Sequence, residues 1–336
     1  MMPIPSHCQR IVLASRPRGA VQPENFRLEP VALGVIEEGQ VLVRNHYLSL
    51  DPYMRGRMSE AKSYAAAQRL DETMLGTTAG EVIASRNPRF AVGDMVVDRL
   101  GWAELGIADG STMRKVDTSR IALQAYLGIV GMPGMTAWYG INQIMMPVRG
   151  ETVLVSAAAG AVGSAAGQLA KLRGCRVVGI AGGPEKCAYV VSELGFDACV
   201  DYKAGNVAAD LAAAAPDGVD ALFENVGGEG FDAALPLMNA FGRIAMCGLV
   251  AGYNGDEFTV RNLRYVLTSR LSLRGFIISE HLDLWPQGLG EMAALVTDGA
   301  IRYRETMAQG LASAPDAFIG LLKGRNFGKQ LVKLIS

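Results

Sequence analysis

A short turn of glycine and alanine holds the residues whose spacing points most directly to chemistry. It reads Ala157-x-x-Gly160-x-x-Gly163, after an apolar run at 152–156 and before a helix expected over 164–173. Backbone N–H groups point outward at the start of a helix, and the helix dipole favours an anion there. Gly160 and Gly163 leave space where side chains would block a pyrophosphate or the contact between strand and helix. The turn could therefore cradle a phosphate.

The spacing alone leaves a second interpretation open, in which the turn only joins a strand to a helix. The first position of the usual G-x-G-x-x-G pattern is an alanine here, and such turns are common in α/β proteins. A second strand is expected at 176–180, about one helix later. A unit of this size favours dinucleotide binding.

The residues after this second strand bear on which dinucleotide would bind. A site that prefers NAD usually places Asp or Glu there to accept hydrogen bonds from the ribose hydroxyls. This chain reads Ile180-Ala181-Gly182-Gly183 and has no carboxylate before Glu185. Lys186 follows and could pair with a 2′-phosphate, although it could also be an ordinary solvated lysine of a helix. The sequence predicts NADPH rather than NADH.

Residues that could bind zinc are few and scattered. The three histidines, His7, His46 and His281, lie far apart, and no two of the five cysteines have C-x-x-C spacing. His46 falls in an alternating strand and is expected to be structural. Zinc sites need a cluster of such ligands, so we expect neither a catalytic nor a structural metal.

The first 125 residues are predicted to form short strands, which include 41–47, 80–85 and 95–98. Short strands with frequent turns suggest a small barrel or sandwich. Glycines and a proline at 131–134 mark a boundary, where Thr136 is expected to cap the next helix.

From residue 151 onward, strands and helices alternate. The expected strands are 152–156, 176–180, 198–200, 220–224, 243–247 and 271–278. The expected helices between them are 164–173, one with Pro184 in its first turn, 207–215 and about 231–238. Strands joined by helical crossovers predict an α/β fold with an open, doubly wound parallel sheet of the Rossmann kind. The tail at 324–335 ends in a pattern typical of a strand.

Composition limits the class of protein. The chain has 336 residues, 50% of them hydrophobic, and a net charge of −1. This size allows two domains, and the charge does not indicate a nucleic-acid partner. An odd, scattered set of cysteines suits a reducing compartment. No apolar run is long enough for a membrane span, and the N-terminus lacks the apolar region of a signal peptide. We expect a soluble cytoplasmic protein.

Short motifs in a fixed order cover nearly the whole chain. They are 13–19 (LASRPRG), 23–28 (PENFRL), 47–58 (YLSLDPYMRGRM), 127–137 (LGIVGMPGMTA), 157–163, 174–187 (GCRVVGIAGGPEKC), 224–228 (ENVGG), 247–254 (CGLVAGYN), 275–278 (GFII) and 326–329 (NFGK). The chain thereby resembles the zinc-independent medium-chain dehydrogenase/reductases, and within them the leukotriene B4 dehydrogenase / prostaglandin reductase group. Its strongest likeness in that group is to the branch of bacterial NADPH-dependent curcumin reductases.

The resemblance implies two domains. A GroES-like β-barrel catalytic domain would be built from residues 1–125 and from a C-terminal return at 301–336, around a central Rossmann NADPH-binding domain at 126–300. Members of the family are often homodimers that meet at the edge strands of their sheets, which makes 271–278 a candidate interface.

The resemblance also implies a set of cofactor contacts. Gly160, Ala161, Val162 and Gly163 would hold the pyrophosphate, and Lys186 and Tyr202 would lie near the 2′-phosphate. The rest of the cofactor would be lined by Asn225, Cys247, Gly248, Leu249, Tyr253, Phe276, Ile277, Ile278 and Asn326. Without the resemblance, Tyr202 would be interpreted as a surface tyrosine, and Asn225 and Asn326 as turn or loop residues.

The reaction implied by the resemblance is reduction of the carbon–carbon double bond of α,β-unsaturated ketones and aldehydes. Hydride adds at the β-carbon and an enolate forms, whose oxygen needs a hydrogen-bond donor. Tyr253, after the fifth strand of the sheet, is the first candidate, and Tyr53 in the first domain is the second. Either tyrosine could instead be a wall of the apolar substrate pocket.

The expected lining of that pocket is Tyr53, Met54, Met132 and Met135, because methionine adapts to varied apolar ligands. Core packing is the competing interpretation for each methionine. Three other activities stay open. These are an NADPH quinone oxidoreductase, a dehydrogenase that oxidises alcohols, and a protein that binds NADPH without catalysis.

Overall fold

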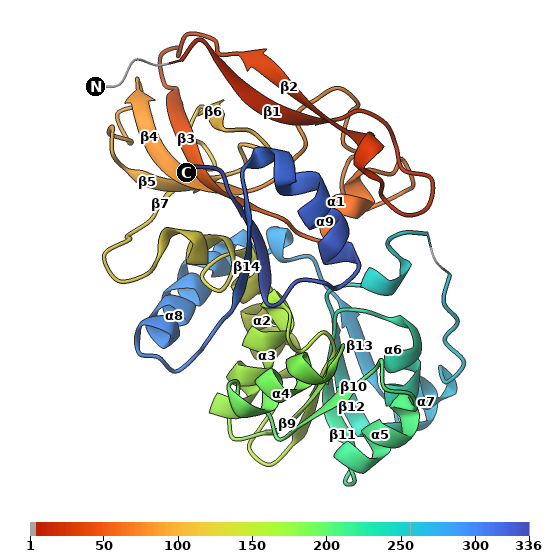
Figure 1. Cartoon of the computed structure of the whole chain (residues 1–336). Coiled ribbons are helices and arrows are strands. Elements are labelled where there is room, and N and C mark those ends of the chain that lie inside the picture. The colour runs from red at the N-terminus through yellow and green to blue at the C-terminus, as the bar shows by residue number, and fades with distance from the viewer. Residues whose placement is uncertain (1–4, 256, 336) are drawn as a thin grey trace. The chain divides into compact units, whose positions relative to one another are not determined.

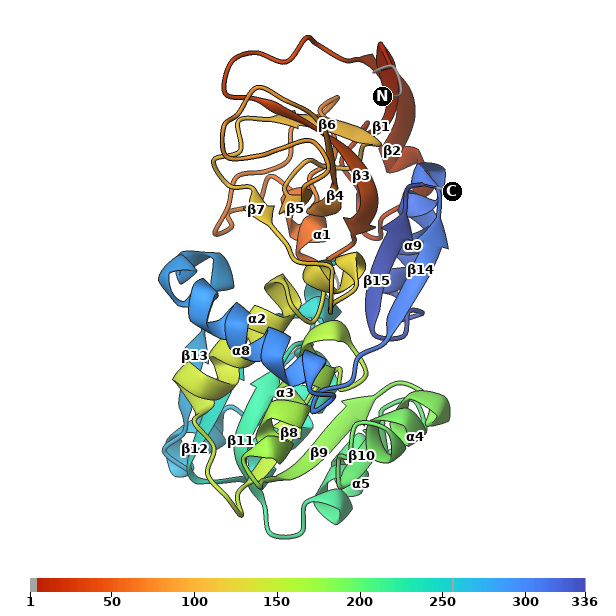
Figure 2. The same cartoon turned by 90° about the vertical axis from the view of Figure 1, so that its left-hand side faces the viewer.

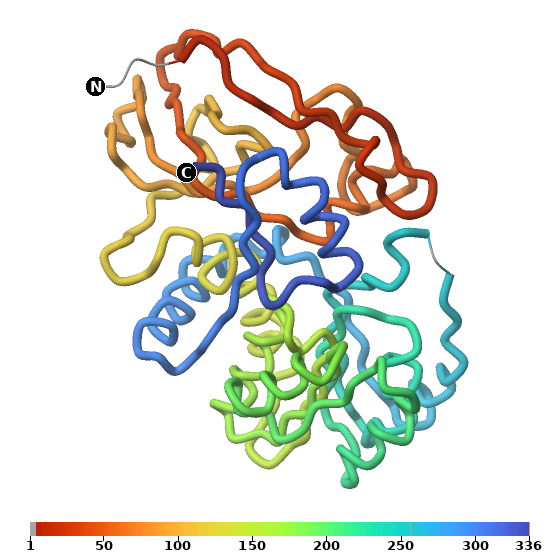
Figure 3. The backbone as a smooth tube through the Cα atoms, viewed as in Figure 1, coloured from red at the N-terminus to blue at the C-terminus, as the bar shows by residue number. Residues whose placement is uncertain are grey.

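The computed structural model describes residues 5–255 and 257–335, and the chain divides into two compact units. We call Met1–Leu127 together with Glu305–Ser336 the terminal unit, and Gly128–Arg304 the central unit. Figure 3 traces the chain from its red start, through the green central unit, to a blue end that belongs again to the terminal unit.

The terminal unit is built mainly from antiparallel strands. Its strands are β1 (His7–Leu13), β2 (Phe26–Ala32), β3 (Val41–Ser49), β4 (Thr78–Ser85), β5 (Met95–Asp98), β6 (Leu105–Ala108), β7 (Arg114–Lys115), β14 (Glu305–Gln309) and β15 (Lys329–Lys333). A seven-stranded sheet has the order β14-β15-β3-β4-β5-β7, with β6 paired to β3, while β1 and β2 form a ribbon of their own (Figure 1). Two helices, α1 (Tyr53–Arg57) and α9 (Ala314–Leu322), complete the unit.

The core of the terminal unit joins the two ends of the chain. Phe26 stacks on Trp102 with ring centroids 5.3 Å apart, and Phe318 meets Trp102 edge-on at 5.8 Å. The strand predicted for the tail is confirmed as β15, which pairs antiparallel with β3 through Leu331 and Ser49. Burial of these large side chains fixes α9 to β2 and to the segment at Trp102, and the pairing of β15 fixes the C-terminal strand to β3.

The central unit is a parallel sheet covered by helices. Its strands are β8 (Thr152–Val155), β9 (Arg176–Ala181), β10 (Ala198–Asp201), β11 (Val219–Glu224), β12 (Met238–Met246) and β13 (Ser272–Gly275). Their order, β10-β9-β8-β11-β12-β13, with every neighbouring pair parallel, confirms the predicted doubly wound sheet. All four residues of β8 are buried, as expected for the middle of a sheet with both faces covered.

Helices cover both faces of this sheet. They are α2 (Met132–Tyr139), α3 (Ala161–Leu172), α4 (Pro184–Ser192), α5 (Val207–Ala214), α6 (Gly228–Ala234), α7 (Arg264–Thr268) and α8 (Trp285–Thr297). Helix α2 packs against α3 and α8 on one face, and α5 packs against α6 on the other (Figure 2). No helix among the described residues is both long and apolar enough to cross a membrane.

The predicted starts of helices α3 and α2 were wrong. Helix α3 begins at Ala161 rather than at 164, because Gly160 already serves as its N-cap. Helix α2 begins at Met132 after Gly131, so Thr136 lies inside the helix and does not cap it. Its Oγ1 donates instead to the carbonyl of Met132 at 2.8 Å, a bond between residues four apart within the helix.

Further boundaries in the second half of the sheet also differ from the prediction. Strand β12 begins at Met238 rather than at 243, so the residue predicted to end the preceding helix belongs to the strand. Strand β13 ends at Gly275, so Phe276, Ile277 and Ile278 follow the sheet instead of belonging to it. Helix α6 begins at Gly228, three residues before the predicted start. The apolar pattern continues past the strand because Phe276 and Ile278 are buried outside the ladder.

Candidate functional site

The turn between β8 and α3 has the shape of a phosphate cradle. Ala157 adopts a positive φ of 49°, and Gly160 caps the helix without any side-chain hydrogen bond. A Cβ on Gly163 would stand 2.3 Å from the carbonyl oxygen of Ala157, so only glycine fits there. The N–H groups of the first helical turn are left for an anion. Gly160, Ala161 and Val162, three of the four predicted pyrophosphate contacts, are partly exposed in this turn.

The end of β9 carries no carboxylate that could reach a ribose hydroxyl. Gly182 and Gly183 follow Ala181, and the Asp201 carboxylate at the end of β10 is occupied by backbone donors. It accepts the N–H of Gly183 at 2.7 Å and that of Lys203 at 2.9 Å, and these bonds lower the pKa of Asp201. Both bonds go to Oδ1, so this oxygen of Asp201 joins the turn after β9 to the turn after β10.

Two lysines and a tyrosine gather at this place. Tyr202 lies over Gly182, because a Cβ on that glycine would stand 2.7 Å from the ring. Burial lowers the pKa of Lys186, and the nearby positive charge of Lys203 lowers it further. The Lys203 ammonium lies 5.8 Å from the centre of the Tyr202 ring. Lys186 of α4 and Lys203 after β10 thus place two positive charges where the adenosine ribose of the cofactor is predicted to bind.

Asn225 and Cys247 meet where β11 and β12 end. The Cys247 thiol donates to Asn225 Oδ1 at 3.0 Å, and Asn225 Nδ2 donates to the carbonyl of Ser156 at 2.7 Å. Burial raises the pKa of Cys247, so the thiol stays protonated and can donate. The structure therefore brings two predicted cofactor contacts to one edge of the sheet, next to the end of β8.

Tyr253 returns to the same edge through a short 3-10 turn at Val250–Gly252. Its backbone N–H donates to the carbonyl of Val250 at 3.2 Å. A Cβ on Gly248 would stand 3.6 Å from the Tyr253 hydroxyl, so the phenol reaches back over the start of this loop. Leu249 is exposed beside it.

The segment after β13 supplies packing as well as backbone. The ring of Phe276 lies 5.2 Å from that of Tyr139 and meets Phe223 edge-on at 6.4 Å. Ile278 is buried, and Ile277 between them is half-buried. Of this predicted trio, Phe276 contributes its side chain to the aromatic core of the central unit.

In the terminal unit, Tyr53 begins helix α1 directly after Asp51 and Pro52. The Asp51 carboxylate is buried and accepts from Lys329 Nζ at 2.7 Å and from the Ser49 hydroxyl. Lys329 also donates to the carbonyl of Leu50 at 2.7 Å. Burial raises the pKa of Tyr53 well above its ordinary value, and the Asp51 charge adds to the shift. The Tyr53 phenol is therefore a donor at any physiological pH.

The remaining predicted residues are placed as follows. Met54 is fully buried in the core of the terminal unit, and Met135 is fully buried where α2 packs on α8. Met132 is half-buried at the start of α2. Asn326 Nδ2 donates to the carbonyl of Gly328 at 2.7 Å within its own loop. Met54 and Met135 thus pack in the cores of their units.

Both parts of the chain match known protein families. Residues 9–116 match a family profile described as the N-terminal domain of oxidoreductase, and residues 161–294 match one described as zinc-binding dehydrogenase. An NADPH-dependent curcumin reductase of Escherichia coli is 46% identical over 333 residues, which cover 97% of this chain and 96% of that protein. The chain belongs to the medium-chain dehydrogenase/reductase family.

Two further relatives of this family agree with that assignment. A 2-alkenal reductase (NADP(+)-dependent) of Nicotiana tabacum is 40% identical over 334 residues, covering 96% of each chain. The crystal structure of CurA from Vibrio vulnificus in complex with NADPH superimposes with a TM-score of 0.93 and 45% identity, over 98% of this chain and 99% of that one.

Some members of the medium-chain dehydrogenase/reductase family carry zinc, as the name of the second profile implies. Among residues 5–255 and 257–335, no three His, Cys, Asp or Glu side chains lie close enough together to hold a metal ion. His46 lies in β3 with its Nε2 3.8 Å from Glu81, and burial lowers its pKa. This geometry suits a structural histidine.

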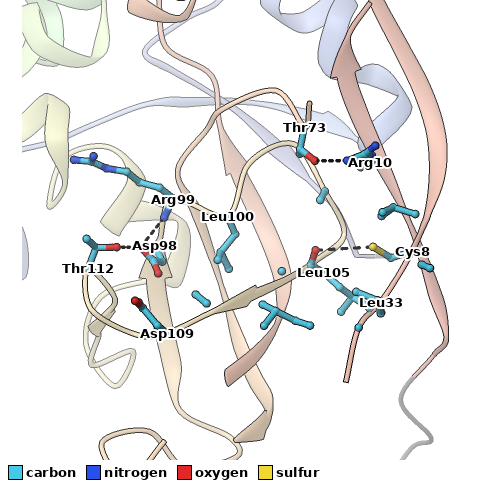
Figure 4. Close-up of a pocket in the computed structure, with 17 residues that line it drawn as sticks. Cys8, Arg10, Leu33, Thr73, Asp98, Arg99, Leu100, Leu105, Asp109 and Thr112 are labelled. Carbon is cyan, nitrogen blue, oxygen red and sulfur yellow. Dashed lines mark hydrogen bonds between the residues drawn. The ribbon is translucent and has the colours of Figure 1, made fainter. Parts of the chain in front are cut away.

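A separate cavity of about 410 Å³ lies in the terminal unit, lined by β1, β6 and the segment around Arg99 (Figure 4). Arg10 and Asp98, two charged residues of its lining, already have partners. Arg10 donates to Thr73 and to Glu29, and Asp98 accepts from Thr112 Oγ1 at 2.7 Å and from the N–H of Arg99. None of the predicted site residues lines this cavity.

The sequence analysis missed four polar residues that lie beside predicted site residues of one unit or the other. Lys203, Ser156 and Glu224 lie beside predicted contacts in the central unit, and Lys329 anchors Asp51 in the terminal unit. A polar residue at the end of an otherwise apolar strand, as in Ser156 and Glu224, was the available signal. No local signal pairs Lys329 with a residue 278 positions away.

Proposed function

We propose that this protein is an NADPH-dependent reductase of the carbon–carbon double bond of α,β-unsaturated ketones and aldehydes. The observation that carries the proposal is 46% identity along nearly the whole chain to an NADPH-dependent curcumin reductase. The turn at 157–163, which we call the phosphate turn, and the lysines at 186 and 203 support it. The 2-alkenal reductase relative supports the same type of bond as the target.

The residues of the central unit fit NADPH. A Cβ on Gly163 would collide with the backbone of Ala157, so glycine lets helix α3 begin close against the turn, with its first N–H groups available to an anion. Lys186 after β9 and Lys203 after β10 stand where an NAD site would offer a carboxylate. Gly160 to Gly163 would hold the pyrophosphate, and Lys186, Lys203 and Tyr202 the 2′-phosphate. When bound, NADPH supplies the hydride for the β-carbon of the substrate.

The chain's own task in the reaction is to stabilise charge. As hydride reaches the β-carbon, negative charge develops on the carbonyl oxygen and an enolate forms. A hydroxyl aimed at that oxygen lowers the barrier because it interacts more strongly with the transition state than with the ground state. We assign this role first to Tyr253, beside the ends of the strands where ligands of such sheets bind, and second to Tyr53.

The test is NADPH oxidation, followed at 340 nm, with a panel of enones, enals and quinones. We expect turnover with enones and enals, and products in which the double bond is saturated and the carbonyl is retained. With NADPH carrying deuterium at the transferable position, the label should appear on the β-carbon. Turnover confined to quinones, or a product alcohol with its double bond intact, would assign one of the other activities. NADPH binding with no turnover on any substrate would indicate a non-catalytic protein.

A further inference from the structure

Glu224 at the end of β11 has a fully buried carboxyl group, and one of its oxygens accepts three hydrogen bonds. One oxygen, Oε1, accepts from the Ser156 hydroxyl at 2.9 Å, the N–H of Val226 at 2.6 Å and the N–H of Gly227 at 2.8 Å. Oε2 is buried and has no hydrogen-bond partner in the described part of the chain. A single buried oxygen thus binds two strand ends to one turn.

The same hydrogen bonds, which we call the Glu224 network, also fix Asn225. The N–H of Asn225 donates to Ser156 Oγ at 2.7 Å, and its side-chain amide lies between the carbonyl of Ser156 and the thiol of Cys247. The Ser156 hydroxyl oxygen therefore accepts a hydrogen bond from the N–H of Asn225, and its O–H donates one to Glu224 Oε1. Loss of the Glu224 acceptor would let the Ser156 hydroxyl turn toward the carbonyl of Phe223, 3.4 Å away, and would thereby loosen the bond that it accepts from the N–H of Asn225.

Glu224 also holds the shape of the turn that follows it. Gly227 and Gly228 have positive φ values of 76° and 65°, and the carboxyl oxygen takes the two N–H groups that precede this bend. The turn in its own right supports the loop that carries Tyr253. The N–H of Val250 donates to the carbonyl of Asn225 at 3.3 Å, and that of Ala251 to the carbonyl of Val226 at 2.9 Å.

The strand order of the central sheet indicates which half of a bound dinucleotide would lie beside the turn after β11. A doubly wound sheet binds a dinucleotide across the point where the strand order reverses, with one nucleotide on each side of the first strand. Here β9, which ends beside Lys186, lies on one side of β8, and β11 lies on the other. The turn after β11 therefore belongs to the nicotinamide half.

We propose that Glu224 is a positioning residue for the nicotinamide half of the cofactor, acting through the acceptor Oε1 on Asn225 and on the loop from Cys247 to Tyr253. The inference rests on the proposed function. It predicts that Glu224 affects binding of the complete dinucleotide but not of its adenosine half. Burial raises the pKa of Glu224, so glutamine, which keeps one carbonyl oxygen in the same volume, is a close substitute.

The experiment compares two ligands on purified full-length variants by calorimetric titration. NADPH reports on both halves of the site, and 2′,5′-ADP reports only on the adenosine half. In Glu224→Ala we expect the Kd for NADPH to rise by at least about tenfold, as for loss of a buried acceptor, while the Kd for 2′,5′-ADP stays within about twofold. Glu224→Gln should restore NADPH binding to within about threefold of the parent.

Two further variants keep the test decisive. Glu229→Ala, an exposed carboxylate five residues along the chain, is the matched control and should change neither Kd. Ser156→Ala removes the link between Glu224 and Asn225 and should weaken NADPH selectively, even where Glu224→Ala does not fold. Equal weakening of both ligands, an unchanged NADPH Kd, or no rescue by glutamine would overturn the inference. A parent protein that binds 2′,5′-ADP but not NADPH would instead contradict the proposed function.

Discussion

Tyr253 is the residue on which the proposed chemistry depends most. Its hydroxyl reaches back over Gly248 at the carboxyl edge of the parallel sheet. Tyr253→Phe removes only that hydroxyl, and loss of one oxyanion donor typically lowers kcat by about 10²–10³. We expect that loss of kcat on a good enone, with the KM for NADPH nearly unchanged, measured by steady-state kinetics in which the enone and NADPH concentrations are varied in turn. A variant with full kcat would exclude Tyr253 as the donor.

Tyr53 offers a comparison with a distinct pH signature. Burial and the Asp51 carboxylate raise the pKa of Tyr53, so the phenol stays protonated beyond the range in which an ordinary tyrosine ionises, near pH 10. If Tyr53 is the main donor, Tyr53→Phe carries the large loss and the parent's kcat stays level up to about pH 10. If it only shapes the pocket, the substitution should change KM for the enone more than kcat.

Lys186 and Lys203 should decide the choice of cofactor. Burial lowers the pKa of Lys186 and the charge of Lys203 lowers it further, and a phosphate dianion between the two lysines would offset both effects. The double variant Lys186→Ala, Lys203→Ala should weaken NADPH by about 10–100-fold, the loss expected for two charge-assisted hydrogen bonds. NADH binding should stay nearly constant. Titration at two salt concentrations checks this, with exposed Lys323→Ala as the control.

At the scale of elements, the sequence was most informative where the pattern was local. The strands β8, β9 and β5 fall within one residue of their predicted ends, because short apolar runs between turns leave little freedom. Helix starts were harder. Small residues at 161–163 gave no sign of where helix begins, and Thr136 has the side chain of a cap but lies five residues too late.

The candidate site divides in the same way. The phosphate turn and the missing carboxylate after β9 could be predicted because both are properties of a few consecutive residues. The Glu224 network and the ion pair of Asp51 with Lys329 could not be predicted, because each joins segments that only the folded chain brings together. Buried polar partners of this kind have no periodic signature.

The ion pair between Lys329 of β15 and Asp51 before α1 should hold the terminal unit together. Both side chains are almost fully buried, at 5% and 7% exposure. Removal of one partner leaves a buried charge, which costs about 3–5 kcal/mol. We expect that loss of unfolding free energy in Lys329→Met, measured by urea denaturation.

A matched control for this pair exists in the central unit. Lys171 and Asp197 are 2.8 Å apart but 31% exposed each. Exposed pairs contribute about 0–1 kcal/mol, so Lys171→Met should change stability little. Equal effects of the two substitutions would show that burial does not govern the strength of these pairs.

At the scale of the whole molecule, the central sheet ends at an open edge. Strand β13 is last in the strand order, and all four of its residues are exposed. An edge of this kind pairs readily with another chain. We propose that two copies pair there as a homodimer, so Leu273→Lys should shift the mass measured by light scattering toward the monomer. Val35→Lys, on an exposed residue of the terminal unit, should not. A monomeric parent would contradict this assembly.

NADPH should stabilise the central unit more than the terminal unit, because the phosphate turn, Lys186, Lys203 and the Glu224 network all belong to the central unit. A ligand that binds only the folded state adds about 2.7 kcal/mol of stability at a concentration of 100 Kd. We expect NADPH to raise Tm by the corresponding amount, and NADH at the same concentration to raise it far less. Hydrogen exchange should slow around 157–163, 182–203 and 225–253, the segments that would surround the dinucleotide. Equal shifts with both cofactors would remove the case for a 2′-phosphate site, whereas protection confined to 182–203 would show that the nicotinamide half does not reach the turn after β11.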